Sequence, residues 1–219
     1  MVVCSCKNAQ IKEAKLDNNA QKLADDIQQS FLNLLNDHLP KDLLQKTKEK
    51  QTVKILSIAC GRFREASSLF KYFSGYEEHI KLYGIDTSKE LLDQAKEDLI
   101  LIDKNKSTSL KLADASLLES YHEWLTNGLF NLIIIRHPEI TFNTDIFIKI
   151  FSTCATLLEK NAYILITTHF ENEKEALLLL LKMLKLKVVS CLLNDNAPIV
   201  KKENESLYAD RFMILVSSG

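Results

Sequence analysis

Small or acidic residues follow three successive apolar runs of this sequence, and each run is typical of a buried strand. The first run is followed by the loop 57–65, which reads Ser-Ile-Ala-Cys-Gly-Arg-Phe-Arg-Glu, and the next two runs end at Asp86 and Asp114. Small side chains from Ala59 to Gly61 let the backbone approach a ligand closely, and glycine adopts positive φ without strain. A carboxylate at such a strand end can accept hydrogen bonds from both hydroxyls of a ribose. The pattern therefore predicts contacts to a nucleoside.

Each of these residues also has a purely structural interpretation. Asp86, like Thr87 and Ser88 beside it, can cap the following helix, and Asp114 can cap the next one. The loop can be a tight strand-to-helix turn with a single glycine. In the ligand interpretation, Asp114 accepts a hydrogen bond from the exocyclic amine of adenine. Because suitable residues stand at three successive strand ends, the sequence favours the nucleoside site.

Arg136 and His137 follow the most apolar run of the chain, 130–135, and are the candidate catalytic residues. An imidazole titrates near neutral pH, so His137 can take a proton from an oxygen or nitrogen nucleophile. Arg136 can bind an acidic substrate group through two parallel hydrogen bonds. Pro138 predicts an extended backbone for His137. In the alternative interpretation, His137 is buried beside Pro138 without a chemical role, and Arg136 pairs with Glu139 or caps a helix.

Alternating strands and helices must position these residues. Apolar runs predict strands over 53–58, 81–86, 110–114, 130–136, 162–168, 187–193 and 211–217. Apolar residues at helical spacing predict helices over 8–39, 65–73, 88–102, 117–125, 144–158 and 174–186. The alternation predicts an α/β fold with a doubly wound, mainly parallel seven-stranded sheet. The last two strands, joined by a polar linker, predict an antiparallel hairpin at the end of that sheet.

We expect two parts of the chain, an N-terminal helical cap over 1–52 and an α/β domain over 53–219. The helix over 8–39 carries an apolar stripe that includes Ile27 and Phe31. That stripe must be buried against the α/β domain. We expect the helix to cover the mouth of the ligand pocket.

The composition argues against several classes of protein. The chain has 219 residues, 46% of them hydrophobic, and a formal net charge of -1, so it can bury a core and is not typical of a disordered chain. Only four of its 28 basic residues are arginines, and without a net positive charge a nucleic-acid partner is not expected. No apolar run suits a signal peptide or a membrane span, and the five scattered cysteines form no zinc motif. We expect a cytoplasmic protein with reduced thiols, no metal and no membrane partner; the sequence leaves the oligomeric state open.

Five segments resemble, in order, those of the Rossmann-like (class I) S-adenosylmethionine-dependent methyltransferases. They are VKILSIACGRFREASSLF, KLYGIDTSKELLDQAKEDL, LKLADA, FNLIIIRHPEI and LLEKNAYILITT, and with the terminal hairpin the resemblance spans 53–217. The segment GIDTSKELLDQA matches best, because the family typically has a strand followed by Asp-x-Ser-x-x-x-Leu-x-x-Ala. The resemblance implies a Rossmann-like fold, S-adenosylmethionine as the cofactor and S-adenosylhomocysteine as the product.

The same resemblance implies where the cofactor lies. The loop would line the methionine and ribose part, Asp86 with Thr87 would hold the ribose hydroxyls, and Asp114 with Ala115 would contact the adenine. Arg136 and His137 would face the methyl donor and the substrate. The expected cofactor-binding residues are Ser57, Ala59, Cys60, Gly61, Arg62, Asp86, Thr87, Asp114, Ala115 and Arg136.

Three residues depart from the family pattern; Ala59 is a mild replacement of a glycine, and the other two departures are larger. Ser57 stands where the family has an acidic residue that helps to fix the amino group of the cofactor. Phe63 stands where the family has a glycine, and its bulk predicts a narrower methionine end. We expect methyl transfer to a small molecule or a protein side chain, by in-line attack on the sulfonium methyl. The two departures favour an alternative, a methyltransferase-like scaffold that serves as a binding module without transferring methyl groups.

Overall fold

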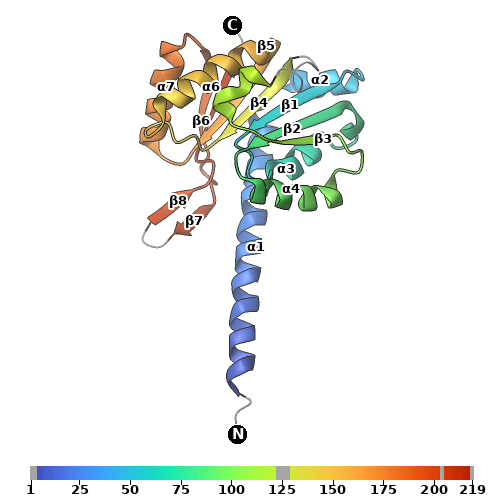
Figure 1. The fold of residues 1–219 in the computed structure, drawn as a ribbon, viewed down its shortest axis with the longest axis vertical. Coiled ribbons are helices and arrows are strands. Elements are labelled where there is room, and N and C mark those ends of the chain that lie inside the picture. The colour runs from blue at the N-terminus through green and yellow to red at the C-terminus, as the bar shows by residue number, and fades with distance from the viewer. Residues whose placement is uncertain (1–3, 122–128, 203–204, 218–219) are drawn as a thin grey trace.

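The computed structural model describes residues 4–121, 129–202 and 205–217, which form a seven-stranded sheet between two layers of helices (Figure 1). The strands of the sheet are β1 Val53–Ile58, β2 Ile80–Asp86, β3 Thr108–Leu112, β4 Phe130–Arg136, β5 Leu158–Thr168, β6 Lys187–Leu193 and β9 Phe212–Ser217. Their order is β3-β2-β1-β4-β5-β9-β6. The first five strands in this order, from β3 through β2, β1 and β4 to β5, are mutually parallel, and β9 is antiparallel to β5 and β6. The predicted α/β fold is confirmed, although the antiparallel strand lies inside the sheet rather than at its edge.

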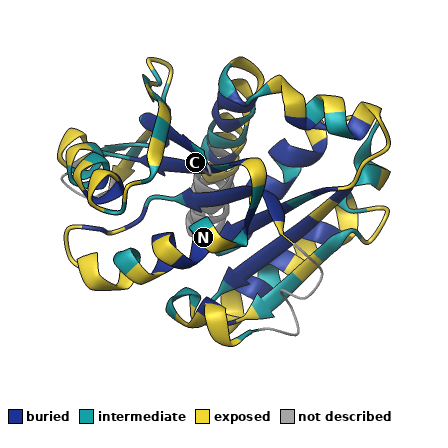
Figure 2. Ribbon diagram, turned by 90° about the horizontal axis from the view of Figure 1, so that it is seen from above, coloured by how far each residue is buried: buried dark blue, intermediate teal, exposed yellow. Residues whose placement is uncertain are grey.

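Each face of the sheet has its own apolar core, and Figure 2 shows buried strands between helices whose outer faces are exposed. The helices are α1 Cys4–His38, α2 Lys41–Lys48, α3 Glu65–Tyr72, α4 Lys89–Ile102, α6 Thr144–Leu157 and α7 Glu171–Met183, with short 3₁₀ helices η1 Glu77–His79 and η2 Ala115–Ser120. One core combines α1 to α4 with the strands, and the other combines η2, α6 and α7 with them. Covered faces explain why β1 and β4 are apolar almost throughout.

Helix α1 has two parts with different surroundings. Its first part runs away from the domain, and its second part packs against α3 (Figure 1). Phe31, Leu34 and Leu35 on the second part share a core with Ile55 of β1. The Ser68 hydroxyl of α3 also donates to the backbone carbonyl of Gln28, at 2.9 Å. The second part of α1 therefore belongs to the hydrophobic core of the domain.

Two segments differ from the elements predicted for them. The segment predicted as a polar linker contains a second, two-stranded sheet, β7 Ile199–Lys202 with β8 Glu205–Tyr208, which projects from the domain (Figure 1). The predicted helix over 117–125 begins instead as the 3₁₀ helix η2, and residues 122–128 lie outside the described residues. Among the described helices, none is long and apolar enough to span a membrane.

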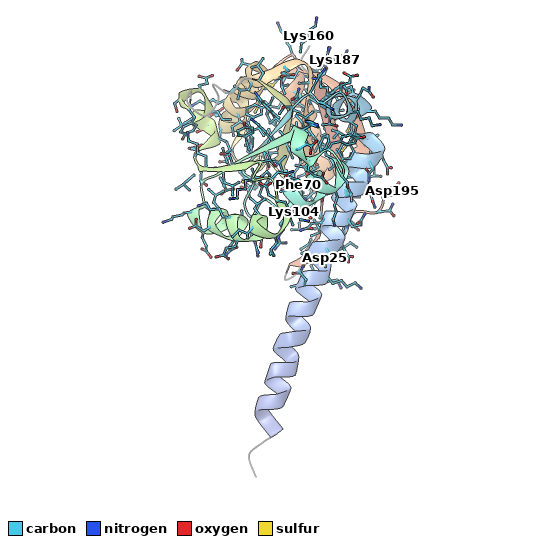
Figure 3. All side chains as sticks on the ribbon, turned by 90° about the vertical axis from the view of Figure 1, so that its right-hand side faces the viewer. Asp25, Phe70, Lys104, Lys160, Lys187 and Asp195 are labelled. Atoms are coloured by element: carbon cyan, nitrogen blue, oxygen red, sulfur yellow. The ribbon has the colours of Figure 1, made fainter. Side chains whose placement is uncertain are left out.

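The carboxyl ends of the parallel strands face the side from which α1 projects. In Figure 3, Lys160 and Lys187, near the beginnings of β5 and β6, lie at the opposite end of the molecule from Asp25 on α1. Asp195, which follows β6, lies beside α1. Ligands of doubly wound sheets bind beyond the carboxyl ends of the strands, so this side of the molecule holds the candidate site.

Candidate functional site

The loop after β1 adopts a left-handed backbone at alternate residues. The φ angle is 52° at Ala59, Gly61 and Phe63. Such a backbone costs a residue other than glycine about 1–2 kcal/mol, so contacts around the loop must hold it. One of these contacts joins the loop to β2, because the Gly61 N–H donates to Asp86 Oδ2 at 2.7 Å. The loop and Asp86, which the sequence assigns to one ligand, are therefore in direct contact.

Asp86 and Asp114 each accept a local backbone hydrogen bond. Asp114 is the N-cap of η2, whereas the N-cap of α4 is Ser88 and Asp86 lies two residues before it. Asp86 Oδ1 accepts a hydrogen bond from the Ser88 N–H, and Asp114 Oδ1 accepts one from the Ser116 N–H, each at 2.8 Å. The Ala113 N–H donates to the Asp86 carbonyl at 2.9 Å, which brings the ends of β2 and β3 together. A carboxylate oxygen can accept two hydrogen bonds, so these hydrogen bonds leave room for ligand contacts at both residues.

Phe63 is a buried residue, and the narrower methionine end expected from its bulk stays a prediction. Its side chain is 2% exposed and lies in the core together with Cys60. Both pack over Gly84 of β2, where an added Cβ would lie 2.9 Å from the Cys60 sulfur and 3.3 Å from the Phe63 ring. The left-handed turn of the loop directs both side chains inward. Burial, with the charges of Glu65 and Asp86 adding to it, raises the pKa of the Cys60 thiol, which opposes a role as a nucleophile.

Arg62 and Arg136 already have carboxylate partners. Arg62 donates from Nε and Nη2 to Asp98 of α4, at 3.2 and 2.9 Å, in a largely exposed pair. Arg136 donates from Nε to Asp210 Oδ1 at 3.1 Å and from Nη2 to Asp210 Oδ2, and its Nη1 lies 3.6 Å from Glu65 Oε2. Its partners are thus Asp210 and Glu65. The Arg136 guanidinium links two buried carboxyl groups, so it has few N–H donors left to bind a substrate.

Asp210, two residues before the start of β9, is the carboxylate with the most hydrogen-bond and ion-pair contacts in the site. It is fully buried, and its Oδ1 also accepts from the Thr167 hydroxyl at 2.6 Å. Desolvation raises the pKa of Asp210, but the charge of Arg136 and the contacts with His137 outweigh it and hold this pKa well below its usual range. Asp210 is therefore an ionised carboxylate inside the protein.

Glu65 brings an acidic group to the end of β1, where Ser57 replaces the acidic residue of the methyltransferase pattern. The Ser57 hydroxyl donates a hydrogen bond to Glu65 Oε1. Glu65 is the first residue of α3 and is 4% exposed. Burial raises the pKa of Glu65, although Arg136 and Ser57 oppose that shift. A carboxyl group therefore lies beside Ser57, supplied by the next helix instead of the strand.

His137 and His169 form a stacked pair at the ends of β4 and β5. Their ring centroids are 3.7 Å apart and the rings are inclined by 17°. The φ angle of His137 is 53°, so the extended backbone predicted from Pro138 is wrong. The His137 N–H donates to the Thr167 carbonyl at 2.8 Å, and this contact with the ring stacking offsets the local strain. Burial lowers the pKa of His137, although Asp210 opposes the shift, so the imidazole is neutral at neutral pH.

A cavity of about 390 Å³ brings many of these residues together. Its lining residues are Ile27, Ala59, Cys60, Arg62, Arg64, Glu65, Arg136, His137, His169, Val200 and Ala209. Ile27 of α1 closes one side, and the Arg136 guanidinium lies 4.7 Å from the centre of the Phe31 ring. Helix α1 therefore contributes to the lining of this cavity, and its role as a cover over the pocket mouth stays a prediction. Asp86, Thr87, Asp114 and Ala115 are not among the lining residues and lie along the ends of β2 and β3.

Sequence reasoning missed Glu65, Thr167 and Asp210. Glu65 has a weak sequence signal. Strand β1 contains no acidic residue, and Glu65 is the first acidic residue that follows it. Asp210 has none, because its partner Arg136 lies 74 positions away. Among the described residues, no group of three or more His, Cys, Asp and Glu side chains is arranged to hold a metal ion.

The residues present fit both ends of S-adenosylmethionine. Asp86 has acceptor capacity for ribose hydroxyls beside the Gly61 backbone. In the cavity, the Glu65 carboxyl group can face an amino group, and Arg64, which is exposed, can face a carboxylate. These donors and acceptors complement a nucleoside joined to an amino acid.

The fold is similar to solved structures of methyltransferases. Magnesium protoporphyrin IX methyltransferase from Synechocystis PCC 6803, solved with bound SAM, has a TM-score of 0.56 at 10% identity, covering 89% of this chain and 83% of that one. An S-adenosylmethionine-dependent methyltransferase from Clostridium acetobutylicum has a TM-score of 0.55 at 15% identity, covering 85% and 95%. An rRNA methylase from Streptococcus thermophilus has a TM-score of 0.53 at 14% identity, covering 82% and 94%.

These similarities show that the chain has the class I methyltransferase fold, as the sequence resemblance implied. No family model matches the chain, and no curated protein matches it. Because the similar structures include an rRNA methylase, they do not support the expectation that a nucleic-acid partner is unlikely.

Proposed function

We propose that this chain is an S-adenosylmethionine-dependent methyltransferase of a small molecule or a protein side chain. The observation that carries the proposal is the contact between Asp86 and the Gly61 backbone, which joins the end of β2 to the loop after β1. It puts a carboxylate for the ribose beside a backbone that a ligand can approach. The cavity at the end of β4 is lined by Ala59, Cys60 and Arg62 of the same loop.

Three groups of residues hold the cofactor in this proposal. Asp86 and Thr87 face the ribose, and Asp114 and Ala115 face the adenine. The loop 59–62 and Glu65 face the amino-acid end. When bound, S-adenosylmethionine supplies a methyl group on a positively charged sulfur. The chain binds and orients the reactants, and proximity can supply a large part of the rate enhancement.

His137 is the proton acceptor in this proposal. With the cofactor bound, an oxygen or nitrogen of the substrate would gain the methyl group while the carbon–sulfur electron pair stayed on the sulfur, and this acceptor atom would have to lose a proton. The acceptor's proton leaves to the neutral imidazole of His137. The depressed pKa of His137 supports this role, because a neutral imidazole has a lone pair to accept the proton. Arg136, by contrast, orders Glu65 and Asp210 instead of anchoring a substrate.

The two residues that favoured a non-catalytic scaffold are compatible with an enzyme. Phe63 lies in the core. The Glu65 carboxyl group lies beside Ser57 and can replace the missing acidic residue. Both observations support an enzyme. Ile27 and Val200 line the cavity, so an acceptor that enters it meets apolar side chains.

Calorimetric titration with S-adenosylmethionine and S-adenosylhomocysteine tests the proposal. We expect both to bind the wild-type protein. Loss of a charged hydrogen-bonding group costs about 1.5–3 kcal/mol, so Asp86→Ala should bind roughly tenfold to a hundredfold more weakly. Asp114→Ala should lose less, because Asp114 is exposed.

Asp103→Ala is the matched control, because Asp103 also accepts backbone hydrogen bonds, from Ser107 and Thr108, but away from the strand ends that form the site. It should bind both ligands as the wild type does. Absence of any binding at millimolar ligand would refute the proposal. Equal affinity of Asp86→Ala and the wild type would show that Asp86 has only a local structural role.

A further inference from the structure

We infer that Asp210 is a positioning residue that keeps the proton of the neutral His137 imidazole on Nε2 and leaves Nδ1 as the basic nitrogen. The inference deepens the proposed function, on which its catalytic meaning rests. The contact it describes is a property of the protein alone. It can therefore be tested without a cofactor or a substrate.

Asp210 is held in one orientation by its other partners. Arg136 donates to both of its carboxylate oxygens, and the Thr167 hydroxyl donates to Oδ1 at 2.6 Å. The carboxylate is fully buried, whereas a quarter of the His137 side chain is exposed. A carboxylate fixed in this way can impose an orientation on an imidazole that has one side open to the cavity.

Two contacts with Asp210 compete for Nε2 of His137, and they require opposite states of that nitrogen. Nε2 lies 3.0 Å from Asp210 Oδ1, which can only accept a hydrogen bond when the carboxylate is ionised. It also lies 3.3 Å from the backbone N–H of Asp210, which can only donate one. A proton on Nε2 satisfies the first contact, and a bare Nε2 satisfies the second.

The carboxylate contact is the stronger of the two. It is shorter, and a hydrogen bond to an ionised group is roughly twice as strong as one between neutral groups. A bare Nε2 would also direct its lone pair toward a negative oxygen 3.0 Å away. The proton therefore belongs on Nε2. The neutral ring then has its lone pair on Nδ1.

His169 stacks on the His137 ring and holds it in one plane, and a contact with Tyr208 determines which nitrogen of His169 carries a proton. Nδ1 of His169 lies 2.9 Å from the Tyr208 carbonyl, which only accepts, so this nitrogen carries the proton of the neutral His169 ring. The stacking at 3.7 Å opposes rotation of His137. The charged or titratable groups that face His137 are Asp210, which favours its protonated form, and Arg136 and His169, which oppose it.

This arrangement has a consequence for proton transfer. When Nδ1 accepts the proton of the acceptor group, His137 becomes an imidazolium whose Nε2–H already faces the Asp210 carboxylate. A carboxylate in this position both selects the tautomer and stabilises the charged ring, as in a Ser-His-Asp triad. With the opposite tautomer, the neutral ring would present an N–H at Nδ1 and could not accept the proton there.

Long-range proton–nitrogen NMR of the full chain, labelled with ¹⁵N-histidine, tests the inference. The His137 signals are assigned by their loss in His137→Gln. At a neutral pH at which the ring is uncharged, we expect a protonated Nε2 and a bare Nδ1. A protonated Nδ1 in the wild type would overturn the inference.

Two variants make the test specific. In Asp210→Asn the backbone N–H at residue 210 remains, so we expect the proton to shift toward Nδ1 and the pKa of His137 to fall. Thr167→Val removes a donor to the same carboxylate but keeps its charge, and it should leave the tautomer unchanged. An unchanged tautomer in folded Asp210→Asn would contradict the role of Asp210. If Asp210→Asn does not fold, the wild-type spectrum decides.

The outcome is distinguishable from a failure of the proposed function. The tautomer is measured without ligand, whereas the proposed function fails if neither S-adenosylmethionine nor S-adenosylhomocysteine binds. An Nε2–H tautomer with no binding would leave Asp210 a positioning residue of a site with another ligand. If the cofactor binds but the proton of neutral His137 is on Nδ1, the cofactor assignment stands and the positioning role of Asp210 is wrong.

Discussion

Arg136 at the end of β4 and Asp210 before β9 form a buried ion pair across 74 positions of the sequence. Strand β5 lies between β4 and β9 in the sheet, and Thr167 of β5 donates to the same carboxylate. The pair therefore joins three strand ends on one side of the cavity. Its charges are buried, so each partner is costly to leave alone.

Removal of one partner of this pair should strongly destabilise the protein. We expect Arg136→Met to lower the free energy of unfolding by about 3–5 kcal/mol, because Asp210 becomes an unpaired buried charge. Urea unfolding followed by circular dichroism measures the change. Arg62→Met is the matched control, because the Arg62–Asp98 pair is largely exposed and should contribute about 0–1 kcal/mol. A similar decrease in the free energy of unfolding in both variants would contradict a larger contribution from the Arg136–Asp210 pair.

The same pair should make stability depend on pH in the acid range. The pKa of Asp210 is lower in the folded protein than in the unfolded chain, where it is about 3.9. Its stabilising contribution is therefore complete above the unfolded pKa and is lost as the pH falls toward the folded pKa. The unfolded carboxylate takes up the extra proton, so this loss amounts to about 1.4 kcal/mol per pH unit below about pH 3.

Urea unfolding between pH 2 and pH 7 checks this dependence. The wild type should lose more stability than Asp210→Asn between about pH 4 and pH 2, and the two curves should run parallel above about pH 5. Parallel curves over the whole range would mean that Asp210 has an ordinary pKa.

The two parts of α1 should differ in their effect on stability. A truncation that removes residues 1–20 takes away the part that runs away from the domain, and we expect the melting temperature to change little (Figure 1). Phe31→Ala acts on the second part, where the ring is 1% exposed, and should cost about 3–5 kcal/mol. Thermal and urea unfolding of both variants check this difference. Loss of folding after the truncation would contradict it.

Much of the fold was predictable because buried parallel strands have distinctive apolar runs. The predicted bounds of β1, β4 and β6 agree with the structure. The hairpin β7–β8 was missed because its strands, IVKK and ESLY, are short and have little apolar alternation. The 3₁₀ helix η2 was predicted as the start of an α-helix because periodicity alone does not distinguish a 3₁₀ turn from the first turn of an α-helix.

The candidate site was predictable only where strand order dictates position. Asp86 and the loop after β1 follow adjacent parallel strands, so their proximity follows from the topology. The contacts of Glu65 and Asp210 depend on the path of the backbone in three dimensions, including a φ of 53° at Asp210. His137 departs from the usual conformation before proline because tertiary contacts with Thr167 and His169 outweigh the local preference.

A crystal structure with bound S-adenosylhomocysteine would show whether the ends of β1, β2 and β4 form a cofactor site. We expect ribose hydroxyls within hydrogen-bonding distance of Asp86, adenine beside Asp114, and a sulfur atom facing the cavity that His137 lines. We also expect the Glu65 carboxyl group near the amino group of the ligand. A ligand bound elsewhere, or bound here with its ribose away from Asp86, would contradict this expectation.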